Sequence, residues 1–210
     1  MPRLKVEDRR AALIEAAITV IGERGTAAAT TRGIVAEAGM SLGSFHYAFA
    51  SRDALFAACF ESVAESERDA FEQFTVAADD FRDYARQTFD LYIDLLVRHT
   101  DLQLALYELT LYASRHPELR SLPGEYRRHT RELITELVIR GMAQYGIDDD
   151  ALVAELVNLA LTITDGMTIG YVRERDEGAL RRASAFASAA IDALLTSSAG
   201  IGGGQAAVSS

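Results

Sequence analysis

The stretch that decides the fold is ATTRGIVAEAGMSLGSFHYAFASRDAL, which runs from Ala29 to Leu55. Thr30 and Ser41 are residue types that cap helix N-termini, and each precedes a short helical segment. Gly39 separates the two segments, at a place where helices commonly end on a left-handed residue. Two short helices joined by a glycine turn predict a helix-turn-helix over about residues 29–48. Its second helix has the right size to enter the major groove of DNA.

The second helix of this motif is expected to have two different faces. Its buried face and the facing side of the first helix carry the apolar residues Ile34, Val35, Ala38, Met40, Phe45 and Phe49. The outward residues are Leu42, Gly43, Ser44, His46 and Tyr47. A glycine costs helix stability, so Gly43 is understandable if the backbone must approach another molecule closely.

Helices are predicted on both sides of the motif. Before it, Leu13, Ala16, Ala17, Val20 and Ile21 form the apolar stripe of an amphipathic helix that begins near Arg9. Gly25 follows the last turn, where a helix commonly ends. After the motif, Ser51 caps a fourth helix.

The rest of the chain also predicts helices and no strand. Asp79 and Asp80 are expected to open a helix of about 20 residues, and Thr100 and Asp101 to open another that ends before Pro117. Further helices are expected from about residue 123 to 145, from 151 to 174 and from 178 to 196. The helix over 151–174 is apolar on almost every side and is expected to be buried all round. The fold class is therefore all-α with about nine helices. We expect a helix-turn-helix domain over 1–56, a second helical domain over 57–197 and a disordered tail over 198–210.

Composition limits the class of protein. The chain has 210 residues, only 3 of them proline, and a single cysteine, Cys59, so a disulfide framework and a cysteine zinc site are excluded. No uncharged apolar run reaches 18 residues, and the N-terminal segment is charged. We therefore expect a soluble cytoplasmic protein with no membrane partner. Because 20 of the 21 basic residues are arginine, a bacterial source is expected.

The charge of the chain is unevenly distributed. The net charge is −10, but residues 1–56 hold 7 basic and 6 acidic residues, whereas the remainder holds 14 basic and 25 acidic residues. An acidic body is repelled by DNA phosphates, so only the N-terminal part is suited to face them.

Several short motifs resemble those of the TetR family of bacterial transcriptional regulators. The matching residues are Thr30-Thr31-Arg32, Glu37-Ala38-Gly39, Ser41-x-Gly43-Ser44-Phe45, Tyr47-x-Phe49 and Ser51-Arg52-Asp53-Ala54-Leu55. Two weaker matches, His116-Pro117-Glu118-Leu119 and Asp165-Gly166, lie downstream. The resemblance implies a homodimeric regulator, most commonly a repressor, that binds an operator and responds to a small molecule.

The resemblance also implies which side chains contact DNA. Thr31, Ser44, Tyr47 and Arg52 are expected to contact phosphates, and Arg32, Leu42, Gly43 and His46 are expected to face base edges. Arg3 and Lys5 form a basic arm that would reach phosphate or the minor groove. A two-fold dimer presents two recognition helices, so the operator should be a near-palindrome.

The second domain is expected to form the dimer and to hold the ligand. The apolar helix over 151–174 and the last helix, rich in small residues, are expected to pair with their copies in a four-helix bundle. Aromatic and polar residues among apolar neighbours suit a ligand pocket. The candidates are Phe89, Tyr92, His99, Tyr107, Glu108, Tyr112, Asn158 and Thr162. Glu108 would pair either with a cationic ligand or with Arg115, and each aromatic taken alone is more often plain core.

Catalysis has little support in the sequence. We find no G-x-S-x-G, P-loop, H-E-x-x-H or dinucleotide-binding motif, and the four histidines are scattered without metal-ligand spacing. Asp148 to Asp150 is better explained as a helix cap than as a calcium loop. We therefore expect no catalytic residues, no metal and no cofactor. Two alternatives stay open: a helical ligand-binding or enzymatic bundle, and a transcriptional activator of the same fold.

Overall fold

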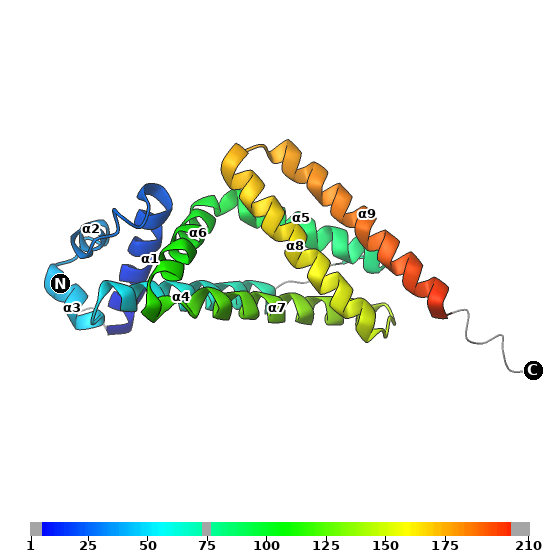
Figure 1. Ribbon diagram of the computed structural model, residues 1–210, viewed down its shortest axis with the longest axis horizontal. Helices are drawn as coiled ribbons and strands as arrows, with labels where there is room; N and C mark the ends of the chain where they lie inside the picture. The colour runs from blue at the N-terminus through cyan, green and yellow to red at the C-terminus, as the bar shows by residue number, and fades with distance from the viewer. Residues whose placement is uncertain (1–5, 73–76, 203–210) are drawn as a thin grey trace, which may run out of the picture. The chain divides into compact units, whose positions relative to one another are not determined.

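The protein is all-helical, as the sequence predicts. The structure, a computed structural model, describes residues 6–72 and 77–202, with side chains described up to residue 197. Within these ranges it contains nine α-helices, one short 3-10 helix and no strand (Figure 1). Arg3, Lys5 and residues 203–210 of the expected tail lie outside the described residues.

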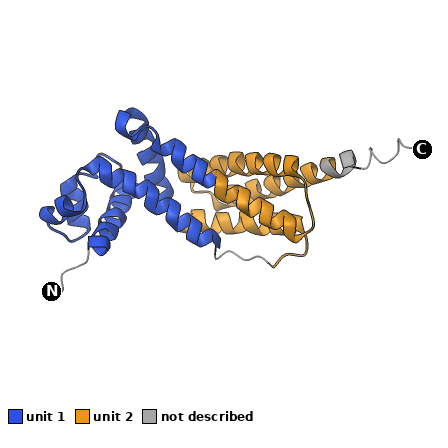
Figure 2. Cartoon of the chain, turned by 90° about the horizontal axis from the view of Figure 1, so that it is seen from below, with its two compact units in different colours: residues 1–72, 99–130 blue, residues 73–98, 131–210 orange. Residues whose placement is uncertain are grey.

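The helices divide between two compact units, which Figure 2 shows in blue and orange. The first unit comprises residues 1–72 and 99–130. Its helices are α1 (Val6–Arg24), α2 (Thr31–Glu37), α3 (Leu42–Ala48), α4 (Arg52–Glu72), α6 (Thr100–Arg115), the 3-10 helix η1 (Pro117–Leu119) and the beginning of α7 (Leu122–Gln144). The unit therefore continues past residue 56, because α6 shares a core with α1 and α4. The domain boundary at residue 56 stays a prediction.

The predicted stripe of α1 lies in the core of the first unit. Leu13, Ala17, Val20 and Ile21 are at most 1% exposed. α1 packs closely against α6 near Gly22, where an added Cβ would lie 2.3 Å from the backbone oxygen of Asp101. This close approach excludes every larger residue from position 22 unless the helices separate.

The second unit comprises residues 73–98 and 131–210, with α5 (Phe81–Arg98), the remainder of α7, α8 (Asp150–Glu174) and α9 (Glu177–Gly202). α9 packs against both α8 and α5 around a core that includes Phe89, Ile93 and Ala187. Asp149 caps α8 as expected, since its side chain accepts a hydrogen bond from the Leu152 amide at 3.0 Å. α9 continues to Gly202, past the expected beginning of the tail at 198.

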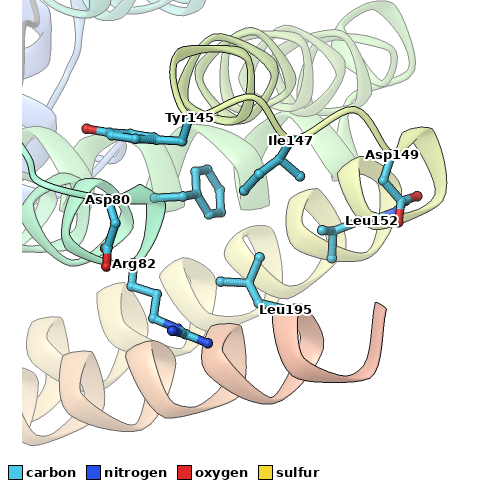
Figure 3. A pocket seen from close by; sticks show the side chains of 8 residues that line it. Asp80, Arg82, Tyr145, Ile147, Asp149, Leu152 and Leu195 are labelled. Carbon is cyan, nitrogen blue, oxygen red and sulfur yellow. The ribbon is translucent and has the colours of Figure 1, made fainter. Parts of the chain in front are cut away.

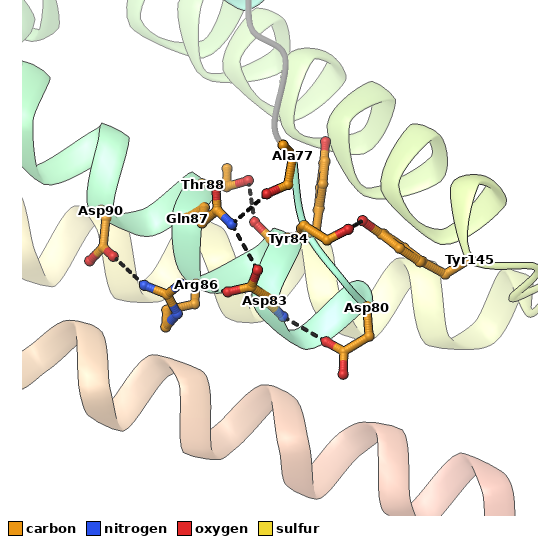
Figure 4. Close-up of polar contacts among 10 residues, drawn as sticks. Ala77, Asp80, Asp83, Tyr84, Arg86, Gln87, Thr88, Asp90 and Tyr145 are labelled. Carbon is orange, nitrogen blue, oxygen red and sulfur yellow. Dashed lines mark hydrogen bonds and ion pairs between the residues drawn. The ribbon is translucent and has the colours of Figure 1, made fainter.

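The beginning of α5 is held by polar contacts (Figure 4). Asp80 Oδ1 accepts a hydrogen bond from the amide of Asp83 at 2.9 Å and so caps the helix. Arg86 donates hydrogen bonds to the carboxylates of Asp83 and Asp90. The Arg86 and Gln87 bonds keep the pKa of Asp83 below its usual value.

The expectation that α8 is buried all round is wrong for the single chain. Leu156, Leu161 and Met167 are buried, but Ile169 is 41% exposed and Gly166 is exposed as well. Within the second unit α9 packs against α8, and an open groove lined by residues of both helices, including Gly166 of α8 and Phe186 of α9, stays uncovered.

α8 is also the one helix among the described residues with the length and hydropathy of a membrane span. A helix that is buried within a folded protein can have the same length and hydropathy.

Candidate nucleic-acid interface

The turn between α2 and α3 is fixed by local hydrogen bonds. Thr30 and Ser41 cap the two helices, each accepting a bond from the amide three residues on. Gly39 has a φ of +63°, which glycine adopts without strain. The amide of Gly39 donates to Ala36 O at 3.2 Å and that of Met40 to Val35 O at 2.7 Å. This pair of bonds is a Schellman motif, so the sequence reasoning located both the cap and the stop correctly.

The inner face of α3 is buried as predicted. Phe45 is 0% and Phe49 3% exposed, and their ring centroids lie 5.9 Å apart. Arg10 of α1 donates a hydrogen bond to the backbone oxygen of Ala48 at 2.8 Å and lies 4.3 Å from the Phe49 ring centroid. Arg10 therefore fixes the C-terminal end of α3, a role that the sequence analysis did not assign to it.

The outer face of α3 is open to solvent. Tyr47 is 61% and Leu42 is 42% exposed, and Gly43 and His46 are also exposed. A Cβ on Gly43 would contact only the Ser41 hydroxyl, at 3.8 Å, so nothing inside the molecule requires glycine there. Ser44 is half-buried, and its hydroxyl is bonded to that of Ser41.

The exposed face of α3 has basic neighbours on other helices. Arg32 is exposed near the start of α2, next to the half-buried Thr31. The Arg9 guanidinium lies 5.1 Å from the Tyr47 ring centroid. Sequence reasoning did not select Arg9, because only the packing of α1 against α3 brings it beside Tyr47.

Arg52 is engaged within the protein rather than extended into solvent. It is half-buried, and its Nη2 donates a hydrogen bond to the Tyr112 hydroxyl at 2.7 Å. Its guanidinium also lies over the rings of Phe56 and Tyr112. Arginine has five N–H donors, so Arg52 can bond to Tyr112 and still have donors for a phosphate. The phosphate contact therefore stays a prediction, and the bond to Tyr112 gives Arg52 a structural role as well.

Two of the ligand candidates on α6 instead hold α6 to the helix-turn-helix side of the first unit. Tyr112 donates a hydrogen bond to Asp53 at 2.9 Å and stacks on His116, and burial raises its pKa. Glu108 accepts bonds from the amide and hydroxyl of Thr26 at 3.4 and 3.3 Å. Both bonds are made to Oε2, and the described residues show no ion pair between Glu108 and Arg115.

The remaining ligand candidates do not gather at one place. His99 is exposed and Tyr107 half-buried on the first unit, while the other four lie on the second. Phe89 is buried in the core, and Tyr92 donates to Thr164 O at 3.1 Å and contacts the Thr168 hydroxyl. Asn158 and Thr162 are exposed on α8. The assignment of these eight residues to a pocket stays a prediction.

The second unit has two open hollows. One, of about 470 Å³, lies where α5 and α8 begin and α7 ends, and none of the ligand candidates lines it (Figure 3). The other is a groove of about 480 Å³ along α8 and α9, and Thr162 is the one candidate that lines it. Among the described residues, no group of three or more His, Cys, Asp or Glu side chains is placed to hold a metal.

A buried carboxylate that the sequence analysis did not select lies on α4. Glu67 Oε1 accepts a hydrogen bond from the Tyr126 hydroxyl at 2.6 Å, whereas the buried Oε2 has no hydrogen-bond partner among the described residues. Burial raises the pKa of Glu67 to about 7, against the lowering effect of the Tyr126 bond. The signal was present in the sequence: Phe56, Phe60 and Val63 form a helical stripe whose next position is Glu67.

Comparison with known proteins agrees with this architecture. Residues 13–59 match the family model described as bacterial regulatory proteins, tetR family, and residues 77–197 match a tetracyclin repressor-like C-terminal domain. The chain is 29% identical over 171 residues to the HTH-type nicotine-responsive transcriptional repressor HdnoR of Paenarthrobacter nicotinovorans, covering 80% of this chain and 86% of that protein.

Solved structures show the same fold. A TetR transcription regulator from Haloarcula marismortui superposes with a TM-score of 0.72 at 23% identity, covering 89% of this chain and 98% of the other. The fatty acid degradation regulator FadR from Bacillus halodurans gives 0.69 at 17% identity, covering 85% and 94%. On the two family matches, the chain belongs to the TetR family and is a transcriptional regulator with a DNA-binding helix-turn-helix and a C-terminal ligand-binding domain.

Proposed function

We propose that the protein is a repressor that binds a near-palindromic operator as a homodimer and leaves it when a small molecule binds. The observation that carries this proposal is the outer face of α3, where Tyr47 and Leu42 are exposed while Phe45 beneath them is fully buried. Among the described residues, no contact inside the molecule requires glycine at position 43 of this outer face, and the width of the helix suits the major groove. Arg9 and Arg32 supply positive charge beside it.

The proposed DNA contacts fall into two kinds. Tyr47, Thr31, Ser44 and Arg52 would hold phosphates, which adds affinity without sequence information. Arg32, Leu42, Gly43 and His46 would face base edges, with Arg32 suited to guanine and Leu42 to a thymine methyl. Arg3 and Lys5 would add contacts from the N-terminal arm.

The test first selects DNA duplexes that bind the full-length protein from a random library. The affinity of the protein for the selected duplexes is then measured by gel shift at two salt concentrations. We expect near-palindromic sequences and an affinity that falls with salt. Tyr47→Ala should weaken binding roughly 10- to 100-fold, since a hydrogen bond to a charged phosphate contributes about 1.5–3 kcal/mol. Leu111→Ala, which changes a side chain that is 54% exposed on α6, is the matched control and should bind like the wild type.

Two results would contradict the proposed operator binding. One is a protein that selects no duplex. The other is a Tyr47→Ala variant that binds as tightly as Leu111→Ala. Activation in place of repression depends on where the operator lies relative to a promoter, and a reporter fusion distinguishes the two.

The dimer is proposed to form through the open side of α8 and α9. Phe186 is 77% exposed there, and added Cβ atoms on Gly166 and Gly170 would meet nothing within 4 Å. Small residues beside an exposed aromatic side chain allow a second pair of helices to approach closely, and a two-fold dimer presents the same patch twice.

Phe186→Glu is expected to give a particle with the mass of a single 22.9 kDa chain in analytical ultracentrifugation, where the wild type gives twice that mass. The introduced charges would be buried face to face, at a cost of several kcal/mol. Operator affinity should fall with the dimer. Leu111→Glu introduces the same charge on α6 and should remain dimeric, and a monomeric wild type would contradict the proposal.

Release of DNA is proposed to be a two-state change. In one state of the dimer the spacing of the recognition helices fits the operator, and in the other it does not. A ligand that binds the second state more tightly shifts the equilibrium toward it, by a coupling free energy that is typically about 1–3 kcal/mol. Within the first unit, the Glu108–Thr26 and Tyr112–Arg52 bonds join α6 to the helix-turn-helix, and α4 continues from it. These contacts are the proposed route of coupling. We place the protein in the cytoplasm, where its operator would be.

The fold alone does not determine the chemical class of the effector. HdnoR is named as responsive to nicotine. We propose that this chain also responds to a small organic molecule.

A further inference from the structure

Of the two oxygens of the Glu67 carboxylate, Oε1 is bonded to Tyr126, whereas the buried Oε2 has no hydrogen-bond partner among the described residues. Every position before Glu67 on the inner stripe of α4 is apolar, including Phe60 at 4% and Val63 at 3% exposure. Oε2 is buried, and no described residue gives it a hydrogen bond. An unpaired buried carboxylate costs folding free energy, so a position that retains one calls for a partner from outside the chain.

The surroundings of Glu67 fit a cation better than a neutral or anionic group. The Tyr126 hydroxyl already satisfies Oε1, which leaves Oε2 as the acceptor. The ring of Tyr126, whose hydroxyl holds Oε1, lies 6.0 Å from the Phe60 ring between centroids, and aromatic faces attract organic cations. The second titratable neighbour on α7, His129, is bonded through Nε2 to the backbone oxygen of Ala64 and does not face the carboxylate as an ion-pair partner.

Oε2 of Glu67 is itself closed to solvent, so a bound group reaches it only when the side chains around it move aside. Glu67 as a residue is only half-buried, so its side chain runs from the surface of α4 inward to the buried Oε2.

We propose that Glu67 is the anionic anchor of the effector site and that the effector is an organic cation whose charged nitrogen pairs with Oε2. This inference rests on the proposed ligand-controlled regulator and names the class of its ligand. Tyr126 orients the carboxylate from the side opposite to the cation, and the Phe60 and Tyr126 rings form the aromatic wall. Glu108 is not assigned this role, because its Oε2 already accepts the amide and the hydroxyl of Thr26.

The test measures ligand binding to the full-length protein by calorimetry. The probes are choline, nicotine and ethidium, together with the carbon isostere of choline, in which a tert-butyl group replaces the trimethylammonium group. We expect at least one cation to bind the wild type and the neutral isostere not to bind. Glu67→Gln keeps the shape and the acceptor for Tyr126 but removes the charge, and it should weaken cation binding roughly 10- to 100-fold.

The matched control is Glu65→Gln, which makes the same change at an exposed position two residues away on α4. It should bind cations like the wild type. The proposal is overturned if none of the three cations binds, if the isostere binds as well as choline, or if both variants behave alike. Operator binding is measured separately without ligand, so a protein that selects operators but fails these tests contradicts the cation site and leaves the regulator proposal standing.

Discussion

Phe45→Ala is expected to lower the free energy of unfolding by about 3–5 kcal/mol, the usual cost of removing a buried phenylalanine ring. Phe45 is 0% exposed and contacts Phe49 at the centre of the helix-turn-helix, so its loss leaves a cavity between α3 and the helices beneath it. Chemical denaturation followed by circular dichroism measures the change. Operator affinity should fall too, because α3 loses its fixed orientation.

The exposed aromatic residue on the same helix provides the comparison. Tyr47 is 61% exposed, so Tyr47→Ala should change stability by no more than about 0.5 kcal/mol while it weakens DNA binding. Equal destabilisation by the two substitutions would mean that the two faces of α3 are wrongly assigned. The pair therefore separates the structural role of α3 from its proposed role in recognition.

Glu67→Gln is expected to stabilise the protein by about 3 kcal/mol at pH 8 and to change little at pH 5. Burial raises the pKa of Glu67 from 4.5 to about 7, and one pKa unit corresponds to about 1.4 kcal/mol. Between pH 4.5 and about 7, the carboxyl of Glu67 holds a proton in the folded chain and has released it in the unfolded chain. Raising the pH through this window therefore destabilises the fold, and above about pH 7 the loss is complete.

Urea unfolding of both proteins between pH 5 and pH 8 measures this difference. The contribution of the other titrating groups is common to the wild type and the variant and cancels in the difference. Glu65→Gln should give a curve parallel to the wild type. Parallel curves for Glu67→Gln would show that the carboxylate is not penalised by burial. The same result would weaken the argument for a cation site.

The local features of the helix-turn-helix could be predicted because their causes are local. Thr30, Gly39 and Ser41 act on amides three or fewer residues away, and the apolar stripes of α1 and α3 need only helical periodicity. The all-α class followed from the same signals repeated along the chain. The resemblance to the TetR family rested on this stretch, and the two family matches confirm it.

The roles of long polar side chains could not be predicted in the same way. Arg52 and Glu108 were assigned to DNA and to a ligand or Arg115, yet in the structure they bond to Tyr112 and Thr26, 60 and 82 residues distant in sequence. Arg9 and Tyr47 meet only because α1 and α3 pack together. The apolar sequence of α8 predicted a helix that is buried all round. That composition does not determine whether the apolar residues are covered by this chain or by another copy of it.

The sequence by itself determined the helices, their caps and the buried face of α3, because a hydrogen bond within a helix and a 3.6-residue period depend only on neighbouring residues. The tertiary structure alone decided which polar groups are satisfied: it pairs Arg52 with Tyr112 and leaves Glu67 Oε2 without a partner among the described residues. The physical reason is that desolvation depends on the three-dimensional surroundings of an atom. Residues far apart along the chain supply those surroundings.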